Sequence, residues 1–355
     1  MLKKILLGAL LFIGLGAAIA YTQRSNIALA LVDNIVTQRM QNPLDELQDG
    51  LHVGLCGTGS PFPDPQRSAP CTLVIAGKDM FLFDAGSAAA KQISNMRFST
   101  GQLKGVFITH FHSDHIDGLG ELLMTRWAQH TEGQRLTVHG PTGIGNVLSG
   151  FVQAYTADTG YRTAHHNEAT MPPGLAGADV NEFAVQKGQY TTVLQKPDLL
   201  IESFAVNHQP INPAVGYRIQ YKGRTVVLSG DTTSNEQVQD AARNADLLVH
   251  EALSPELVGR LQEAALNNQR TKLAKIFADI PNYHATPLDV AVLAKEAGVG
   301  HVVLNHIVPP LPLHPLREIF LGRAPEVFEG PFRIGDDGDF ISLPSGSKEV
   351  VYSRR

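Results

Sequence analysis

The sequence predicts an α/β fold in which strands and helices alternate through two similar halves. Three observations predict this class. Short apolar strands end at glycine-rich turns, amphipathic helical segments separate several of them, and histidines or carboxylates follow strand ends in both halves. An apolar share of 43% is enough for a sizeable core. Together these features favour an α/β sandwich with a functional site along one edge.

The first 24 residues differ from the rest of the chain. Lys3 and Lys4 precede an apolar run, and Ala18-Ile19-Ala20 has the small-x-small pattern of a cleavage site. Residues 1–24 are therefore predicted to be a signal peptide or an N-terminal membrane anchor, with a buried core helix as the other alternative. A leader of either kind predicts a periplasmic or otherwise exported protein, or one anchored to the inner membrane.

Residues 25–50 are expected to form an amphipathic linker helix, because apolar side chains recur at helical spacing between Ile27 and Met40. The hydrolytic domain is expected to cover residues 51–355. Near its start, Cys56 and Cys71 flank one connection. An exported protein can oxidise such a pair, and two small core residues are the alternative.

Each half of the domain is predicted to combine strands with helices. In the first half, the apolar runs at 51–57, 72–77, 80–86, 105–110 and 135–141 are predicted strands, and 117–130 is a predicted helix. In the second half, 199–208, 215–221, 225–231, 246–252 and 301–307 are predicted strands, and 255–277 and 287–298 are predicted helices.

Residues 109–115, Thr-His-Phe-His-Ser-Asp-His, give the strongest chemical signal. So many nitrogens and oxygens at a strand end are costly to bury unless a partner satisfies them. His110 and His112 point the same way if the strand continues, and the next turn directs Asp114 and His115 to a second position. Imidazole and carboxylate suit Zn²⁺, with Fe²⁺ or Mn²⁺ less favoured. Exposed loop histidines without a metal are the alternative.

This His-x-His-x-Asp-His motif resembles the signature of the metallo-β-lactamase superfamily, and the resemblance extends over almost the whole chain from residue 51. It implies the αββα sandwich of that superfamily. Asp84, in Asp84-Ala85-Gly86, matches an aspartate that supports the metal loop. The resemblance implies two zinc ions per chain, one held by His110, His112, His208 and Asp231, and the other by Asp114, His115, His306 and the same Asp231.

Three of these ligands are weak evidence when taken singly. His208 alone is compatible with a core histidine, Asp231 with a turn cap and His306 with a structural histidine. The pairing is chemically sound, since two dications about 3.5–4 Å apart need a shared anion and lower the pKa of a bridging water toward ~7. Asp114 is expected to orient that nucleophile.

Further motifs resemble the ribonuclease Z-like branch, which includes phosphodiesterases and arylsulfatases. They are Gly57-Thr58-Gly59-Ser60-Pro61, Val249-His250-Glu251-Ala252 and Tyr283-His284-Ala285-Thr286. By this resemblance His284 donates a proton to the leaving group and Glu251 orients it, which suits a departing oxyanion. The alternatives are a residue beside the cap of the next helix for His284, and a surface charge for Glu251.

The segment between Gly140 and His208 departs from the tRNA-processing members, which carry a basic arm. It offers Tyr155, Arg162, His165 and His166, which we interpret as substrate-binding residues on the lid of a small-molecule pocket, with Arg162 holding an anionic group. A mobile surface loop is the alternative.

A net charge of -5, without a run of Lys and Arg, weighs against a nucleic acid substrate. The sequence therefore predicts an exported two-zinc hydrolase, arylsulfatase-like, that acts on a small sulfate or phosphate ester. Expected partners are that ester, the membrane only through an uncleaved N-terminal segment, and a possible homodimer. The alternatives are a ribonuclease Z-type phosphodiesterase that processes tRNA 3′ ends, and a non-catalytic metal-binding member of the fold.

Overall fold

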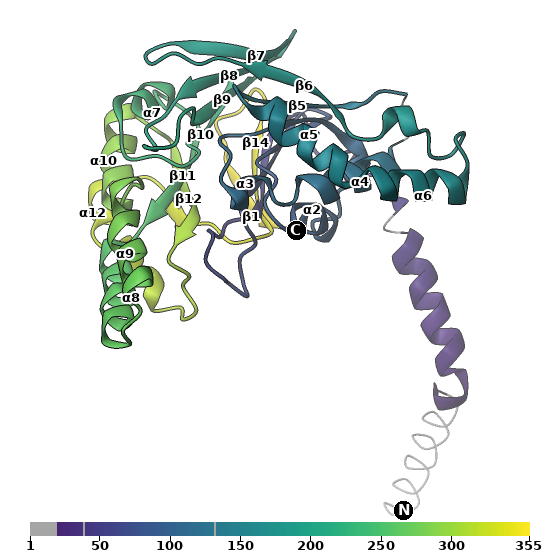
Figure 1. Cartoon of the computed structure of the whole chain (residues 1–355), viewed down its shortest axis with the longest axis horizontal. Coiled ribbons are helices and arrows are strands. Elements are labelled where there is room, and N and C mark those ends of the chain that lie inside the picture. Colours follow the sequence, from purple (N-terminus) through teal and green to yellow (C-terminus); the bar gives the residue numbers. More distant parts are fainter. Residues whose placement is uncertain (1–19, 38–39, 131–132) are drawn as a thin grey trace, which may run out of the picture. The chain divides into compact units, whose positions relative to one another are not determined.

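The structure is a computed structural model that describes residues 20–37, 40–130 and 133–355. The chain divides into two units, residues 1–46 and residues 47–355. In the first unit, residues 20–37 form a helix whose side chains are all exposed (Figure 1). In the described ranges, every helix is too short or too polar to cross a bilayer. Most of the predicted leader lies outside the described residues, and the predicted domain boundaries stay predictions.

The second unit confirms the predicted αββα sandwich. Two sheets pack face to face, and helices cover their outer faces (Figure 1). In the described ranges the first sheet has the order β15-β14-β1-β2-β3-β4-β5-β6. Its strands are β1 (Gly50–Gly57), β2 (Cys71–Ala76), β3 (Asp79–Phe83), β4 (Leu103–Phe107), β5 (Leu136–Pro141), β6 (Ala178–Phe183), β14 (Asp339–Pro344) and β15 (Val351–Arg354).

The second sheet has the order β13-β12-β11-β10-β9-β8-β7 over the same described ranges. Its strands are β7 (Tyr190–Lys196), β8 (Leu199–Ala205), β9 (Val215–Tyr221), β10 (Arg224–Leu228), β11 (Leu247–Leu253), β12 (His301–Val308) and β13 (Phe332–Ile334). The helices of this unit are α2 (Ala89–Asn95), α3 (Ser113–Ile116), α4 (Leu119–Gln129), α5 (Ile144–Ala154), α6 (Thr156–His166), α7 (Glu236–Ala241), α8 (Pro255–Asn267), α9 (Thr271–Asp279), α10 (Pro287–Ala297), α11 (Leu316–Leu321) and α12 (Ala324–Val327).

Parallel pairing decides where the strand ends lie. Strands β3, β4 and β5 run parallel in the first sheet, and β10, β11 and β12 run parallel in the second. The carboxyl ends of parallel neighbours meet at one edge of a sheet, so the residues that follow them are brought together. Between the sheets, buried rings from both sides join the layers, with the Phe107 and Tyr217 centroids 5.7 Å apart.

Three predicted elements differ from the structure. The helix predicted over 255–277 is two helices, because Gln269 adopts a left-handed conformation with φ of 57° between α8 and α9. The segment 140–208, for which a mobile surface loop was the alternative, folds into α5, α6, β6, β7 and the predicted strand β8. Strand β4 ends at Phe107, three residues before His110, so the metal-type motif starts beyond the ladder. Of the two alternatives for the cysteines, the structure has the disulfide, which joins Cys56 and Cys71.

His139, on β5, makes the stability of the fold depend on pH. Its ring stacks on Phe107 with centroids 4.4 Å apart, and Asn181 Nδ2 donates to its Nδ1 at 2.8 Å. Burial lowers the pKa of His139 to about 4. As the pH falls below about 6.5, His139 becomes protonated in the unfolded chain but stays neutral in the folded chain. The free energy of unfolding therefore falls between pH 6.5 and about 4, by up to about 3 kcal/mol.

We expect the His139→Phe variant to lose less stability than the parent protein over this pH range in urea unfolding followed by circular dichroism. The matched control is His314→Phe, which replaces an exposed histidine. Parallel pH profiles for the parent and His139→Phe would show that this ring does not control acid sensitivity.

Candidate metal centre

The residues of the predicted metal motif lie where strands of both sheets end. Thr109 and His110 follow β4, and the chain then turns into α3, which carries Asp114 and His115. From the second sheet, His208 follows β8, and Asp231 follows β10. His306 lies within β12. The sandwich thus brings together side chains that are widely separated in the sequence.

Two groups of potential ligands stand next to each other. The ligand atoms of His110, His112, His208 and Asp231 all lie within 4.8 Å of one another. In the first group, the Nε2 of His110 is 2.9 Å from the Nδ1 of His112, and the Nε2 of His208 is 3.3 Å from the same atom. Such close ring nitrogens fit a shared cation.

The second group consists of Asp114, His115 and His306, and Asp231 lies between it and the first. The ligand atoms of these three also lie within 4.8 Å of one another. Asp231 Oδ2 is 3.4 Å from His115 Nε2 and 3.2 Å from His306 Nε2. The same oxygen is 3.9 Å from the Nε2 of both His110 and His208. One buried carboxylate therefore lies between the two groups of potential ligands.

Unpartnered atoms show that these residues fit a metal. Among the described residues, buried His115 Nε2, Asp231 Oδ1 and His306 Nδ1 have no hydrogen-bond partner. Orphaned buried polar atoms are rare in folded proteins, and a bound ion is one of the few explanations. Of the three, His115 Nε2 faces the Asp231 carboxylate at 3.4 Å, as a metal-binding nitrogen would.

The electrostatics of the first group also favour metal binding. Burial lowers the pKa of His110 well below its ordinary value, and burial lowers the pKa of His112 and His208 as well. Burial alone would raise the pKa of Asp231, but His306 and His115 outweigh it and hold that pKa well below its usual range. Neutral imidazoles beside an ionised carboxylate are the forms that coordinate a cation.

His115 is held by a network that the sequence only partly indicated. Asp84 Oδ2 accepts a hydrogen bond from His115 Nδ1 at 2.8 Å, which leaves Nε2 directed at the centre. Asp84 Oδ1 accepts from the backbone N–H of Thr109 at 2.8 Å, and the Thr109 hydroxyl lies 3.1 Å from His110 Nδ1. Asp84 and Thr109 thereby orient one ring of each group, the role that outer partners play in metal sites.

Burial lowers the pKa of His115, but the carboxylates of Asp231 and Asp84 outweigh it and hold that pKa well above the ordinary value. A cation that binds at the second position therefore has to displace a proton from His115. Metal affinity at this position is accordingly expected to increase with pH.

Local backbone conformation determines the direction of two further side chains, His306 and Asp231. In the pairing of β11 with β12, Glu251 faces Asn305 and Ala252 faces Ile307, so His306 is the extra residue of a β-bulge and has φ of 43°. Bulges re-aim side chains beside active sites. Before Asp231, Gly230 has φ of 60°, and a Cβ there would lie 2.6 Å from the Val215 carbonyl oxygen. Only glycine fits this turn.

His284 and Glu251 form a buried pair at the border of the centre. His284 Nδ1 is 3.1 Å from Glu251 Oε1, and its ring centroid is 5.4 Å from that of His306. Glu251 is 1% exposed and accepts from the backbone N–H of Ala285 and Thr232, so it is not a surface charge. Burial would lower the pKa of His284, but Glu251 raises it to about 8.

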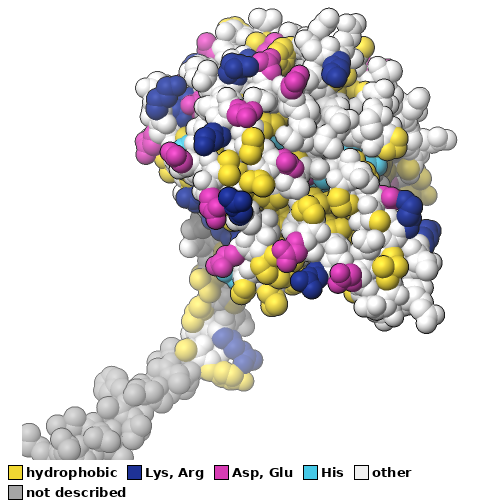
Figure 2. All heavy atoms as spheres, turned by 90° about the vertical axis from the view of Figure 1, so that its left-hand side faces the viewer, with side chains coloured by type: hydrophobic (Ala, Val, Ile, Leu, Met, Phe, Trp, Pro, Cys, Tyr) yellow, Lys and Arg dark blue, Asp and Glu magenta, His cyan; other side chains and the backbone are white. Residues whose placement is uncertain are grey.

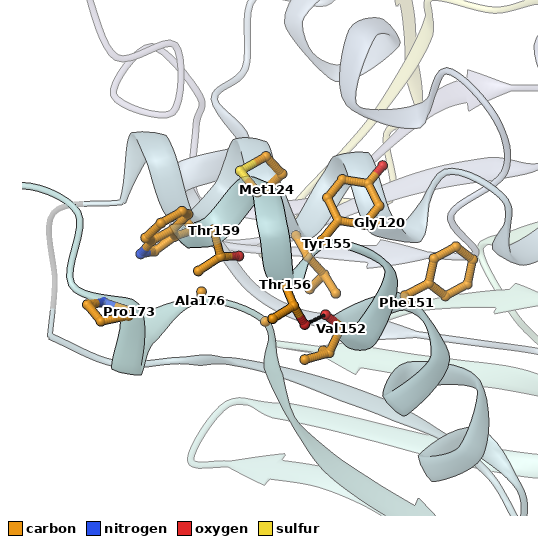
Figure 3. Close-up of a pocket in the computed structure, with 12 residues that line it drawn as sticks. Gly120, Met124, Phe151, Val152, Tyr155, Thr156, Thr159, Pro173 and Ala176 are labelled. Carbon is orange, nitrogen blue, oxygen red and sulfur yellow. Dashed lines mark hydrogen bonds between the residues drawn. The ribbon is translucent and has the colours of Figure 1, made fainter. Parts of the chain in front are cut away.

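The residues predicted to bind substrate lie elsewhere. Tyr155 lines a mainly apolar cavity of about 220 Å³ between α4, α5 and α6, together with Met124 and Phe151 (Figure 3). Arg162 pairs with Asp158 on exposed α6. The exposed rings of His165 and His166 are 6.2 Å apart. None of these four lines the polar cleft of about 430 Å³ that Asp114 borders.

Comparisons with known proteins show the family. The family model described as "Anti-Pycsar protein Apyc1" matches residues 51–259, which is more than half of the 355-residue chain, and the chain belongs to that family. Ribonuclease Z from Mycobacterium bovis (strain BCG / Pasteur 1173P2) is 34% identical over 289 residues, covering 81% of this chain and 96% of the relative.

Solved structures share the fold. The metallo-β-lactamase fold protein YhfI from Bacillus subtilis has a TM-score of 0.59 at 20% identity and covers 83% of this chain and 100% of its own. Human tRNase Z, short form, has a TM-score of 0.58 at 21% identity, covering 82% and 99%. Zn²⁺-bound PqqB from Methylobacterium extorquens has a TM-score of 0.53 at 15% identity, covering 82% and 100%.

These findings overturn the predicted function and partners. The prediction of an exported hydrolase for a small sulfate or phosphate ester, with no nucleic acid partner, is wrong, because relatives over 81% of the chain are named ribonuclease Z. The arylsulfatase-like assignment has no support for the same reason. The error has a physical cause: a net charge of -5 is a sum over the chain, whereas a phosphate responds to the local field of the site.

The predicted location is corrected by the same relationship. The periplasmic, exported or inner-membrane-anchored protein was inferred from a short apolar run behind Lys3 and Lys4, a compositional signal. The match to ribonuclease Z extends over 289 residues and outweighs that signal.

The fold, the motif and the relatives agree on identity at the level of the family. The chain belongs to the ribonuclease Z-like branch of the metallo-β-lactamase superfamily and is a metal-dependent hydrolase that acts on ester bonds.

Proposed function

We propose that this protein is a ribonuclease Z-type phosphodiesterase that cleaves RNA at tRNA 3′ ends and works from a two-zinc centre. The observation that carries the proposal is the 34% identity to ribonuclease Z over 81% of the chain. The complete ligand set supports it, because seven donor residues converge in two adjacent groups that share Asp231.

In the proposed centre, His110, His112, His208 and Asp231 hold one zinc ion, and Asp114, His115, His306 and Asp231 hold the other. When bound, two dications lower the pKa of a bridging water and neutralise the charge of a phosphodiester. Fe or Mn would suit the same donors less well. Asp84 and Thr109 keep His115 and His110 in their orientations through the contacts described above.

Two groups of the chain act on protons in this proposal. Asp114 borders the polar cleft and its Oδ2 lies 3.3 Å from His306 Nε2, so its carboxylate can accept a hydrogen bond from the attacking water. His284, with Glu251 3.1 Å behind it, is positioned to give a proton to the leaving ribose oxygen. A positioned acid of this kind contributes about 10²–10⁴-fold to a rate.

The mixed charge of one face of the protein leads us to expect a weak dependence of RNA binding on salt. On the face seen in Figure 2, Lys and Arg are interspersed with Asp and Glu. A protein that makes two phosphate contacts loses about tenfold in affinity between 50 and 200 mM salt, against about 10³–10⁵-fold for six to ten contacts. We expect the smaller loss, measured as the RNA dissociation constant at graded salt. A steep slope would show an extended basic contact surface.

The direct test is cleavage of an end-labelled precursor tRNA that carries a 3′ trailer. Zinc-loaded protein is expected to cut it at one position and to lose the activity on chelation. A Glu263→Gln variant, altered at an exposed position of α8, is the matched control and should cut normally. The proposal fails if protein that carries two metals and hydrolyses bis(4-nitrophenyl) phosphate leaves this RNA intact.

A further inference from the structure

The Cys56–Cys71 disulfide lies directly behind the second metal position. Cys56 is near the end of β1 and Cys71 begins β2, with Cα atoms 5.0 Å apart and exposures of 0% and 1%. Cys71 lines the same small cavity as Asp84, His115, Asp231 and His306. Cys71 therefore shares a cavity with two ligands of the second position, although neither cysteine is a predicted ligand.

The loop that the disulfide closes is bonded to both sides of this metal position. On one side, Gly86 N donates to the Pro70 carbonyl oxygen at 3.0 Å. Gly86 follows the Asp84 that holds His115, and a Cβ on Gly86 would meet the Asp114 carbonyl oxygen at 2.3 Å. The neighbour of Cys71 thus contacts the turn that packs against the ligand helix α3.

On the other side, Ile307 N donates to the Thr58 carbonyl oxygen at 2.9 Å. Ile307 is the residue after the bulged His306, and Thr58 is two residues after Cys56. One end of the disulfide-closed loop is therefore bonded to the segment of Asp84, which holds His115, and the other end to the segment that carries His306.

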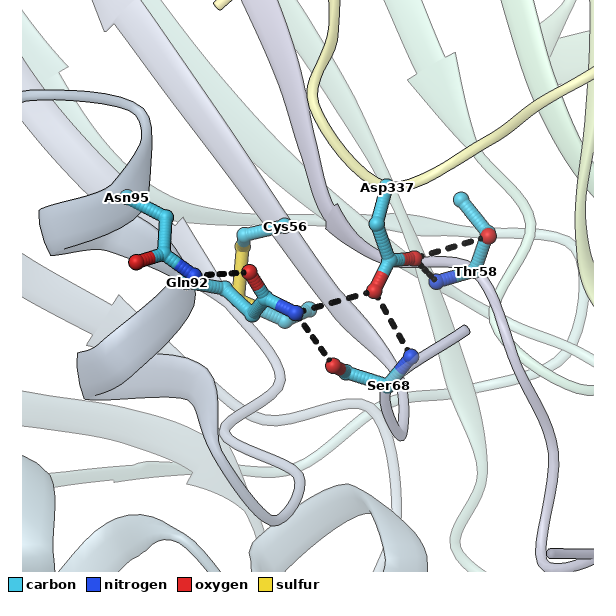
Figure 4. The surroundings of a disulfide bond; sticks show 7 residues. Cys56, Thr58, Ser68, Gln92, Asn95 and Asp337 are labelled. Atoms are coloured by element: carbon cyan, nitrogen blue, oxygen red, sulfur yellow. Dashed lines mark hydrogen bonds between the residues drawn. A yellow bond between two sulfur atoms is a disulfide. The ribbon is translucent and has the colours of Figure 1, made fainter. Parts of the chain in front are cut away.

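Asp337 bonds the two chain segments at the neck of the loop to each other. Asp337 accepts hydrogen bonds from Thr58 N at 2.8 Å, Thr58 Oγ1 at 2.9 Å and Ser68 N at 2.7 Å, and Gln92 donates to Ser68 Oγ at 2.6 Å (Figure 4). The neck is therefore held by Asp337 on one side and by Gly86 and Ile307 on the other, and a change in its width acts on these contacts.

We infer that the Cys56–Cys71 disulfide is a redox-sensitive positioning element for the second metal position. A disulfide holds its sulfurs about 2.05 Å apart, whereas two thiols need van der Waals separation. There is little room, since a Cβ on Gly57 would lie 1.8 Å from the Ala69 carbonyl oxygen. Reduction therefore displaces the neck and disturbs the orientation of His115 and His306. In the reaction, a dithiol reductant gives two electrons and two protons, its own sulfurs join, and Cys56 and Cys71 become thiols.

The inference rests on the proposed metal centre and predicts a selective effect. Reduction weakens metal binding at Asp114, His115 and His306 by about 10- to 100-fold, the usual cost of losing an outer support. Binding at His110, His112 and His208 is weakened less, because the loop reaches these rings only indirectly, through Asp84 and the Thr109 that orients His110. Cleavage then falls with the loss of the second ion.

The test is a metal titration of the full chain in two redox states. The protein is oxidised, or reduced with a dithiol that is removed under inert gas, and its thiols are counted after denaturation. Co²⁺ is then titrated against a competing chromophoric chelator, and the visible spectrum reports each site. We expect two tight equivalents for the oxidised protein and one tight plus one weak equivalent for the reduced protein and for a Cys56→Ser/Cys71→Ser double variant.

A matched control separates this effect from general destabilisation. Leu148→Ala creates a cavity at a buried position of α5 and should keep both tight equivalents although the variant is less stable. Two equal equivalents in both redox states, or two free thiols in air-purified protein, would overturn the inference. Oxidised protein that binds no metal would instead overturn the proposed metal centre.

Discussion

Replacing Asp231 with alanine is expected to remove both metal ions and RNA cleavage together. The Asp231 carboxylate is 2% exposed and lies within 3.9 Å of ring nitrogens from both ligand groups. A rate loss of more than about 10³-fold is expected, since loss of one well-placed charge-stabilising group already costs about 10²–10³-fold. Metal content by mass spectrometry and cleavage rate, on the same sample, measure the effect.

The metal-free Asp231→Ala variant should nevertheless fold. Asp231 is one of the carboxylates that raise the pKa of His115, so its removal lets this ring release its proton, which limits the loss of stability. Urea unfolding of the metal-free forms checks this point, and Asp158→Asn on exposed α6 is the matched control. An Asp231→Ala protein with two ions and normal cleavage would rule out a shared carboxylate.

Replacing His284 with alanine is expected to slow RNA cleavage by about 10²–10⁴-fold, the contribution of a positioned general acid. The same change should have little effect on bis(4-nitrophenyl) phosphate, because nitrophenolate leaves without a proton. His284 contacts Glu251 at 3.1 Å, so Glu251→Gln should weaken RNA cleavage in the same substrate-dependent way. The ratio of kcat values for the two substrates is the quantity to compare.

The two rates, measured together with the metal content, also distinguish loss of an acid catalyst from loss of a metal ion. The possible ligand atoms of His284, Asp231 and His306 also lie within 4.8 Å of one another. Metal content therefore has to be measured in the variant. Equal losses on both substrates, with one ion missing, would make His284 a ligand and not an acid. Full metal content with equal rate losses on both substrates would indicate that His284 has a structural role.

The sandwich and the position of the ligand groups were predictable from the sequence for a physical reason. Apolar strands have a clear periodicity, and the motif around His110 combines donor types that are costly to bury without a cation. His208, Asp231 and His306 were each ambiguous alone, and only the resemblance placed them in order. Asp231 and His306 converge because β10, β11 and β12 are parallel neighbours, whereas His208 follows β8, which is antiparallel to both of its neighbours. No local pattern in the sequence shows either arrangement.

Other parts of the centre were beyond local sequence signals. The Tyr283 carbonyl oxygen lies 2.9 Å from His208 Nδ1, and a backbone group has no signature in the sequence. The bulge at His306 depends on pairing between two strands, and the break of the helix at Gln269 occurs without glycine or proline. Thr109 could have been found, since it precedes His110 in the motif and carries a hydroxyl.

The insertion shows why substrate was the weakest prediction. Arg162 and the neighbouring histidines were interpreted as a lid because of their chemistry, yet α6 has no buried residue and Arg162 pairs with Asp158. The net charge also favoured a small substrate over a nucleic acid. It is a poor guide, because it contains no information on where a phosphate binds the protein.

The central claim is tested most directly by locating the metals in crystals of the active protein, with anomalous diffraction recorded on both sides of the zinc absorption edge. We predict two anomalous peaks about 3.5–4 Å apart, with Asp231 between them. His110, His112 and His208 should surround one peak, and Asp114, His115 and His306 the other. Active protein with no peak among these residues would contradict the account.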